Sequence, residues 1–150
     1  MQTVDLYYIH FPFTLLSVEE LMDLMAESVE AGKIRAVGVS NFKAKQMRRA
    51  ATRVARYNIP LAANQDRYNL MHRQPEENGA LDACRELNVA LVAYRPLERG
   101  QLKSDTAPRP SSRSPMLTNR KTKASSKVEL LQGTLEEIAE QCGRVLARSL

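Results

Sequence analysis

Cysteine is scarce in this sequence, and long apolar runs and a basic leader are missing. The cysteines are Cys84 and Cys142. Two cysteines are too few for a disulfide-stapled scaffold and suit a reducing compartment, so we expect a cytoplasmic protein. No apolar run approaches the roughly 18 residues that a membrane span needs, so we expect no membrane insertion. Residues 1–10 carry Asp5 and no basic residue ahead of their apolar stretch, so we expect no secretory signal.

Histidine, a common metal ligand, is equally scarce. The two histidines, His10 and His72, lie far apart in the sequence and have no cysteine pair near them. Metal sites in proteins need several such ligands at close spacing. We therefore expect no metal site, and we expect His72 to lie on the surface.

What is present is the composition of an ordinary globular domain. The chain has 150 residues, of which 43% are hydrophobic and 26% are charged, with a formal net charge of +5. Such values are typical of one soluble domain. The positive charge is unevenly spread, because residues 98–127 contain eight basic and two acidic residues while the rest of the chain is close to neutral.

This basic segment, residues 98–127, also contains three prolines and many serines and threonines. Such a composition buries too little apolar area to offset the entropy of ordering the chain, so we interpret the segment as a long mobile loop. A polyanion-binding arm is the alternative interpretation. No aromatic residue lies between the charges to stack on bases, so nucleic acid is not the partner we expect.

Short apolar runs alternate with helical stretches along the first 97 residues. Expected strands cover residues 4–10, 36–42, 61–65 and 89–94. Expected helices run from a capping box at Ser17 and Glu20 up to Gly32, and over residues 44–57, 76–87 and 128–142. Strands that alternate with helices at this spacing predict parallel βαβ units with right-handed crossovers.

Polar residues stand at the carboxyl end of every expected strand. They are His10, Ser40, Asn41, Asn64, Gln65 and Tyr94. In a (β/α)8 barrel, the carboxyl ends of all strands meet at one mouth, where the active site forms. An open sheet instead concentrates its ligand contacts at one switch point, usually beside a glycine-rich phosphate loop. The sequence has no such glycine motif, which favours an α/β fold of the TIM-barrel type.

These strand ends resemble the aldo-keto reductase family. Residues 4–10 resemble the family's fourth barrel strand with its active-site histidine, and residues 32–42 are close to its signature at the fifth strand. Residues 64–70 and 93–100 are similar to the sixth and seventh strands with their exit loops. Four motifs in the correct order make the resemblance specific, and it extends from residue 4 to about residue 102.

The resemblance implies NADPH-dependent reduction of a small aldehyde or ketone to an alcohol. His10 would orient the carbonyl group and support the proton donor, a role that suits a neutral imidazole. The residues implied to bind NADP(H) are Ser40, Asn41, Gln65, Tyr94, Leu97 and Gly100. The first three would hold the nicotinamide carboxamide, the Tyr94 ring would stack on the nicotinamide, and the last two would pass close to the pyrophosphate.

The resemblance covers only strands four to seven of the family's barrel. The family's catalytic Asp, Tyr and Lys and its eighth strand have no counterpart here, and Arg95 stands where the family usually has serine. We therefore expect an incomplete (β/α)8 barrel of about four parallel βα units plus a C-terminal helix. The expected parts are a partial barrel core over 1–97, the basic mobile loop over 98–127, and a helix and tail over 128–150.

Three functions are compatible with these observations. The first is a truncated NADP-dependent reductase that is inactive alone. The second is a non-catalytic nucleotide-sensing or interaction subunit, of the type of the channel β-subunits, with another chain completing the barrel. The third is a basic binding module that acts through residues 98–127. We favour the first of these.

Overall fold

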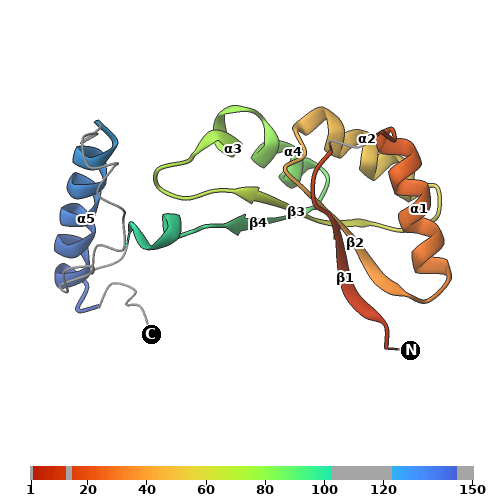
Figure 1. Ribbon diagram of the computed structural model, residues 1–150, viewed down its shortest axis with the longest axis horizontal. Coiled ribbons are helices and arrows are strands. Elements are labelled where there is room, and N and C mark those ends of the chain that lie inside the picture. The colour runs from red at the N-terminus through yellow and green to blue at the C-terminus, as the bar shows by residue number, and fades with distance from the viewer. Residues whose placement is uncertain (1, 13–14, 103–122, 145–150) are drawn as a thin grey trace, which may run out of the picture. The chain divides into compact units, whose positions relative to one another are not determined.

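The computed structural model describes residues 2–12, 15–102 and 123–144, and it divides into two compact units, Met1–Pro96 and Leu97–Leu150. Figure 1 shows the elements of each unit. The first unit carries the sheet and its helices, and the second carries a short 3-10 helix and the last α-helix. None of the helices in the described ranges combines the length and the apolar character that a bilayer crossing requires.

The sheet of the first unit has four parallel strands in the order β1-β2-β3-β4. They are β1 (Val4–Ile9), β2 (Ile34–Ser40), β3 (Leu61–Arg67) and β4 (Ala90–Tyr94). Ser40 lies opposite Gln65, and Arg67 lies opposite Tyr94, so the carboxyl ends of the strands reach one edge of the sheet. The predicted parallel βαβ arrangement is confirmed, although β2 ends at Ser40 instead of continuing to Phe42.

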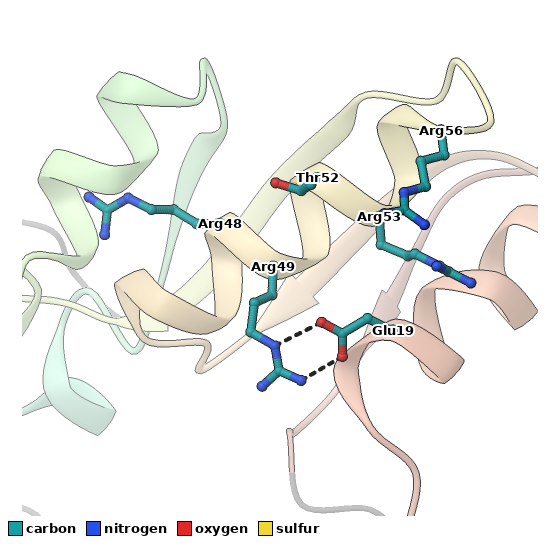
Figure 2. Close-up of a pocket in the computed structure, with 6 residues that line it drawn as sticks. All are labelled: Glu19, Arg48, Arg49, Thr52, Arg53 and Arg56. Atoms are coloured by element: carbon teal, nitrogen blue, oxygen red, sulfur yellow. Dashed lines mark hydrogen bonds and ion pairs between the residues drawn. The ribbon is translucent and has the colours of Figure 1, made fainter.

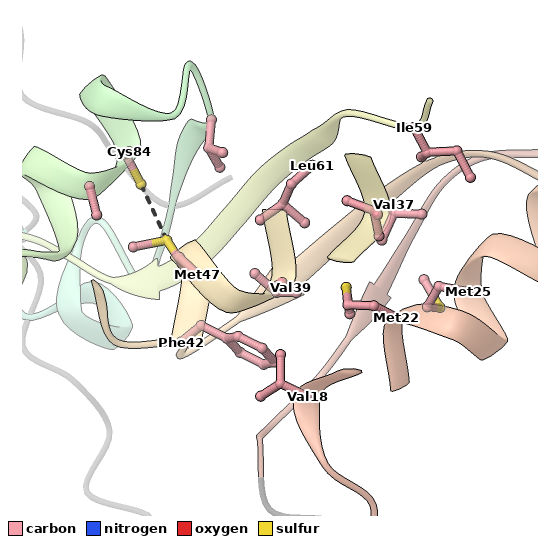
Figure 3. Close-up of a cluster of buried hydrophobic side chains, with 14 of the residues drawn as sticks. Val18, Met22, Met25, Val37, Val39, Phe42, Met47, Ile59, Leu61 and Cys84 are labelled. Carbon is pink, nitrogen blue, oxygen red and sulfur yellow. Dashed lines mark hydrogen bonds between the residues drawn. The ribbon is translucent and has the colours of Figure 1, made fainter. Parts of the chain in front are cut away.

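One face of the sheet is covered by helices. The helices are α1 (Val18–Glu30), α2 (Ala44–Ala55), α3 (Gln74–Glu77) and α4 (Ala80–Glu86), and Figure 1 shows them on the same side of the strands. Met22 of α1 and Met47 of α2 are fully buried with Val37 and Val39 of β2 (Figure 3). Burial of each such side chain contributes about 1.5–3 kcal/mol. On the opposite face, side chains such as that of Gln65 are only half-buried.

The start of α1 shows how the sequence specifies a helix boundary. The Ser17 backbone N–H donates to Glu20 Oε2 at 2.7 Å, and the Glu20 N–H donates to Ser17 Oγ at 3.2 Å. These reciprocal bonds satisfy two backbone donors that the first helical turn would otherwise leave without partners. The predicted capping box is therefore confirmed. The helix ends before Gly32, whose φ of +66° is readily adopted by glycine.

The single helix predicted over residues 76–87 is wrong, because the structure has two short helices there, α3 and α4. Gly79 separates them with a φ of +78°, in the left-handed region that a continuous helix does not contain. The side-chain carbonyl of Asn78 accepts a hydrogen bond from the Ala80 N–H at 3.0 Å, which starts α4. The Asn-Gly pair carried this signal, but the prediction rested on the apolar residues that follow Gly79.

A close approach between neighbouring strands requires a glycine in β2. The aromatic ring of Tyr8 lies directly over Gly38, and a Cβ at Gly38 would stand 2.6 Å from two of its ring carbons. Tyr8 lies opposite Gly38 in the β1–β2 register, so the ring and the space over Gly38 share the face without helices. Partial burial raises the pKa of the Tyr8 hydroxyl.

The second unit contains the 3-10 helix η1 (Glu98–Gly100) and α5 (Lys123–Gln141). Helix α5 begins at Lys123, ahead of the predicted start at Val128, and the first residues of the predicted loop 98–127 form η1. Residues 103–122 of that loop and residues 145–150 of the predicted tail lie outside the described residues. On α5, the apolar side chains of Leu130 and Ile138 are exposed.

Candidate functional site

A hydrogen-bonded cluster joins the carboxyl ends of all four strands. It consists of the side chains of Ser40, Asn41 and Tyr94 with the backbone carbonyls of His10 and Gln65, and we call it the strand-end network. The Ser40 hydroxyl and the Asn41 backbone N–H both donate to the Gln65 carbonyl, each at 2.9 Å. The three side chains, from β2, its exit and β4, therefore meet as the polar strand ends in the sequence predicted.

Asn41 is the centre of the strand-end network. Its Nδ2 donates to Ser40 Oγ at 2.9 Å and to the His10 carbonyl at 3.3 Å. Its Oδ1 accepts a hydrogen bond from the Tyr94 hydroxyl at 3.0 Å. The Asn41 backbone has a φ of +60°, a conformation that asparagine tolerates better than most residues. One amide side chain thus connects β1, β2 and β4.

Gln65 contributes to the site in two ways. Its backbone carbonyl accepts the two bonds from β2 described above, whereas its half-buried side-chain amide makes no hydrogen bond with the described residues. Gln65 is paired with Ser40, so the two side chains lie on the same face of the sheet. The amide of Gln65 therefore offers two donors and an acceptor to a ligand at the mouth.

His10 stands at the predicted place, but its imidazole takes no part in the strand-end network. The ring is exposed and stacks on Phe11, with ring centroids 5.1 Å apart and planes 13° apart. Only its backbone carbonyl is bonded to Asn41.

The exit of β4 has a cation over its aromatic ring. The Arg95 guanidinium carbon lies 5.9 Å from the centroid of the Tyr94 ring, within the range of a cation–π contact. Arg95 has a φ of +56°, which is uncommon for a residue with a long side chain. The residue that departs from the family pattern thus contacts the ring that the resemblance implies for nicotinamide stacking.

Asn69 is a positioning residue that the sequence analysis missed. It is 9% exposed, and its Nδ2 donates to the Arg95 carbonyl at 2.8 Å. Its Oδ1 accepts from the backbone N–H groups of Met71 and His72 at 2.9 and 3.0 Å. Asn69 therefore ties the β3 exit loop to the β4 exit loop. The signal in the sequence was an asparagine two residues after the end of β3, in a stretch typical of a turn.

Asn64 was treated only as a strand-end polar residue, and the structure gives it a structural role. It is fully buried, its Nδ2 donates to the Phe42 carbonyl at 3.2 Å, and its Oδ1 accepts from the Phe42 N–H at 3.4 Å. A buried amide is costly unless it is bonded in this way. Asn64 holds the chain as it leaves β2 and so supports the position of Asn41.

The predicted cofactor contacts Leu97 and Gly100 belong to the second unit. There the Leu97 carbonyl accepts hydrogen bonds from the N–H groups of Gly100 and Leu102, at 2.9 and 3.2 Å. Glu98, Arg99 and Gly100 all have positive φ values, so this segment is a tight turn. The role of the turn in cofactor binding remains a prediction.

Two titratable groups, one on β3 and one on α4, have raised pKa values. Burial raises the pKa of the Asp66 carboxyl of β3, against a smaller opposing effect of the Arg67 N–H, which donates to it at 2.9 Å. Burial, aided by the charge of Asp66, raises the pKa of the Cys84 thiol of α4. Within the described ranges no three or more His, Cys, Asp or Glu residues are grouped so that they could hold a metal ion.

The fold and the mouth define a class of protein. Four parallel strands with their helices, whose carboxyl ends converge on amide and hydroxyl side chains, form part of a (β/α)8 barrel. The model of the aldo/keto reductase family matches residues 1–148. The chain belongs to the aldo/keto reductase family.

Several curated relatives support this assignment. The chain is 42% identical over 101 residues to the aldo-keto reductase yakc [NADP(+)] of Schizosaccharomyces pombe. It is 39% identical over 99 residues to the aldo-keto reductase YhdN of Bacillus subtilis. Each match covers 66% of this chain and 28% of the relative. The matched part of the chain thus spans less than a third of either relative.

Solved structures of the family have the same fold. The thermostable aldo-keto reductase Tm1743, solved with the inhibitor epalrestat, matches with a TM-score of 0.67 at 33% identity, over 94% of this chain and 41% of that one. The glycerol dehydrogenase AKR11B4 from Gluconobacter oxydans matches with a TM-score of 0.73 at 31% identity, over 95% of this chain and 43% of that one. The predicted partial (β/α)8 barrel is confirmed.

Proposed function

We propose that the strand-end network holds the nicotinamide end of NADP(H) in an NADPH-dependent reductase of small aldehydes or ketones. The observation that carries the proposal is the convergence of Asn41, Tyr94 and the open Gln65 amide on one edge of the sheet. One curated relative has NADP(+) in its name, which supports the choice of cofactor. No charged side chain belongs to the network, which suits a neutral, planar ligand group.

The residues present fit a carboxamide. A carboxamide donates through its NH2 group and accepts through its oxygen. Gln65 can supply the donor to that oxygen, because its side chain makes no hydrogen bond with the described residues. Asn41 Oδ1 accepts one hydrogen bond, from Tyr94, and can accept a second from the NH2 group. Ser40 would keep its bond to the Gln65 carbonyl and hold the two strands in register.

Tyr94 and His10 would act on either side of the reacting centre. When bound, NADPH supplies the hydride that reduces the carbonyl carbon. The bond from the Tyr94 hydroxyl to Asn41 fixes the tyrosine so that its ring can serve as a stacking surface. His10, at the end of β1, would donate a hydrogen bond to the substrate carbonyl oxygen.

We further propose that this site works with additional strands. Four parallel strands form half of an eight-stranded ring, and β1 and β4 each have one edge that pairs with no strand of the described residues. A further segment or another chain would complete the ring. The alternative function is a non-catalytic subunit that senses a nucleotide or binds a partner, as in the channel β-subunits. Nucleotide binding without turnover in the completed barrel would favour this alternative.

Cofactor binding can be measured by titrating the chain with NADPH and following the cofactor fluorescence. We expect Gln65→Ala to weaken binding by roughly tenfold, because it removes the amide proposed to bond the carboxamide. Gln2→Ala is the matched control, since Gln2 is exposed and precedes β1, at the end of the strand opposite the mouth. Equal affinity in Gln65→Ala and the unmodified chain would contradict the proposed placement of the carboxamide.

Turnover is tested separately with a small aldehyde and NADPH. We expect no reduction by the 150-residue chain alone, because the family's tyrosine proton donor has no counterpart among its residues. Turnover comparable to that of a full-length reductase would contradict this expectation. A segment supplying the remaining strands should restore reduction, and His10→Ala should then abolish it.

A further inference from the structure

Helix α2 separates its charges from its apolar residues completely. Met47, Ala50 and Val54 are buried against the sheet and the neighbouring helices. The opposite side of the helix is basic, and residues 43–57 contain no aspartate or glutamate. Its basic side chains are Lys43, Lys45, Arg48, Arg49, Arg53 and Arg56. A helix needs only its apolar stripe to pack, so the cations on the outer side are available for other contacts.

Three of these arginines are fixed in place by carboxylates of neighbouring helices. Arg49 Nε donates to Glu19 at 2.8 Å, and Figure 2 shows the paired bonds between these two side chains. Arg53 donates to Asp23 of α1 at 2.6 and 2.7 Å, and Arg48 donates to Glu86 of α4. Each pair uses the Nε and Nη2 atoms of the guanidinium and leaves Nη1 for other acceptors. The side chains have therefore already lost the rotamer freedom that binding would otherwise cost.

The arginines line a groove along the outer side of α2, next to Glu19 of α1. It has a volume of about 250 Å³ and is lined by Glu19, Arg48, Arg49, Thr52, Arg53 and Arg56. Thr52 and Arg56 make no side-chain hydrogen bond with the described residues, and both are exposed. Figure 2 shows them on the same stretch of α2 as the fixed arginines. The groove thus combines fixed cations, one further guanidinium and one hydroxyl.

We propose that this groove is a binding site for a small phosphate-bearing anion, separate from the strand-end network. Guanidinium groups match the geometry of phosphate oxygens and bind them through paired hydrogen bonds. Four arginines line the groove, and three carboxylates pair with three of them, so Arg56 supplies the positive charge in excess. The concave shape and modest volume favour a compact ligand with adjacent phosphates over an extended acidic peptide or a nucleic acid. No aromatic side chain lines the groove to stack on bases.

Titration calorimetry with inorganic pyrophosphate at low ionic strength tests the proposal. We expect saturable binding that weakens with added salt. Arg56→Gln should weaken it roughly tenfold, because it removes a charge-assisted hydrogen-bond donor from the groove. Thr52→Val keeps the shape of the side chain and should weaken pyrophosphate binding by a smaller factor. Arg35→Gln is the matched control, since Arg35 is an exposed arginine paired with Asp5 on β1 and does not line the groove.

Three outcomes would overturn the proposal. The first is an absence of saturation at millimolar pyrophosphate. The second is equal weakening by Arg35→Gln and Arg56→Gln, which would show attraction to the net charge alone. The third is binding of an acidic peptide or an oligonucleotide in the absence of pyrophosphate binding. Arg56→Gln should leave the NADPH titration unchanged, so the result is independent of the function proposed for the strand ends.

Discussion

The helix-covered face of strand β2 and its carboxyl end are stabilised by different kinds of interaction. Val37 and Val39 point toward the helices, are fully buried and pack against apolar side chains. Ser40 and Asn41, at the carboxyl end of the same strand, are joined to other strands by hydrogen bonds. The helix-covered face is therefore held by burial, which has no preferred direction, and the mouth is held by bonds with fixed geometry.

This difference determines how each region responds to change. Replacing a core side chain with a smaller one lowers stability through the lost apolar contact area and the cavity that remains. Replacing a strand-end side chain leaves its partners without their hydrogen bonds. Mutations on the helix-covered face should therefore alter stability, and mutations at the mouth should alter ligand binding with a smaller change in stability.

The largest effect is expected from Phe42→Ala on the helix-covered face. The Phe42 side chain is 1% exposed and belongs to the buried cluster drawn in Figure 3. Its removal should lower the free energy of unfolding by about 3–5 kcal/mol, measured by urea denaturation. Tyr7→Ala is the control, because Tyr7 is 54% exposed and its truncation should have little effect. Equal losses for the two variants would contradict the view that this cluster is the core.

A smaller loss is expected from Gly38→Ala. The new Cβ would stand 2.6 Å from two carbons of the Tyr8 ring, so the ring has to shift away from β2. We expect a decrease of about 1–3 kcal/mol in the free energy of unfolding. In a Tyr8→Ala background the same substitution should cost much less. Additive losses in the double variant would show that contact with the ring is not the cause.

Gly133→Ala is the control for the glycine substitution itself. Gly133 lies in α5, and a Cβ added there would have no heavy atom within 4 Å beyond its own stretch of helix, so alanine meets no obstacle. Alanine has the higher helix propensity, so a slight gain in stability of about 0.5–1 kcal/mol is expected. A loss of stability in Gly133→Ala would indicate that replacing glycine with alanine destabilises the protein even without a contact like that of Gly38 with Tyr8.

The parallel sheet and the position of the mouth followed from the sequence because both depend on local patterns. Apolar runs of the right length predicted the strands, and the capping box at Ser17 and Glu20 predicted the start of α1. The polar strand ends predicted that side chains would meet at the mouth. Ser40, Asn41 and Tyr94 do form one network, whereas the side chains of His10 and Asn64 do not join it.

What the sequence did not reveal depends on contacts between distant segments. Asn69 lies 26 residues from Arg95, and nothing in the local pattern indicates that its side chain bonds to that carbonyl. The contact of Arg95 with Tyr94 and the stacking of His10 on Phe11 depend on side-chain conformations that spacing does not determine. The break between α3 and α4 was missed because the apolar residues that predicted the helix all lie after Gly79 and do not determine where the helix begins.

Asp66 provides a pH-dependent test of how burial affects a polar side chain of the sheet. It lies in β3, and burial raises the pKa of its carboxyl, so the folded state holds the proton more tightly than the unfolded chain. The stability that this proton provides is fully present below the ordinary pKa of aspartate and is lost as the pH rises through the raised value. Asp66→Asn cannot titrate, so its stability relative to the unmodified chain should increase over that pH range, measured by thermal unfolding.

Asp5→Asn is the control for the pH series. Asp5 is exposed on β1 and paired with Arg35, and its replacement makes the same change in charge at the surface. The difference between Asp66→Asn and the unmodified chain should exceed the difference for Asp5→Asn. A difference for Asp66→Asn that shrinks as the pH rises would have the wrong sign and would contradict the effect of burial.

The smallest effect is expected at the mouth, from Arg95→Ser. The guanidinium lies 5.9 Å from the centroid of the Tyr94 ring and competes for the π surface on which the nicotinamide is proposed to stack. An exposed cation–π contact contributes about 0.5–1 kcal/mol, so its removal should tighten NADPH binding roughly two- to fivefold. Arg85→Ser removes the same charge from α4, where Arg85 pairs with Asp82, and should leave the affinity unchanged. Weaker binding by Arg95→Ser alone would show instead that Arg95 contacts a phosphate of the cofactor, and would make the residue a binding group of the mouth.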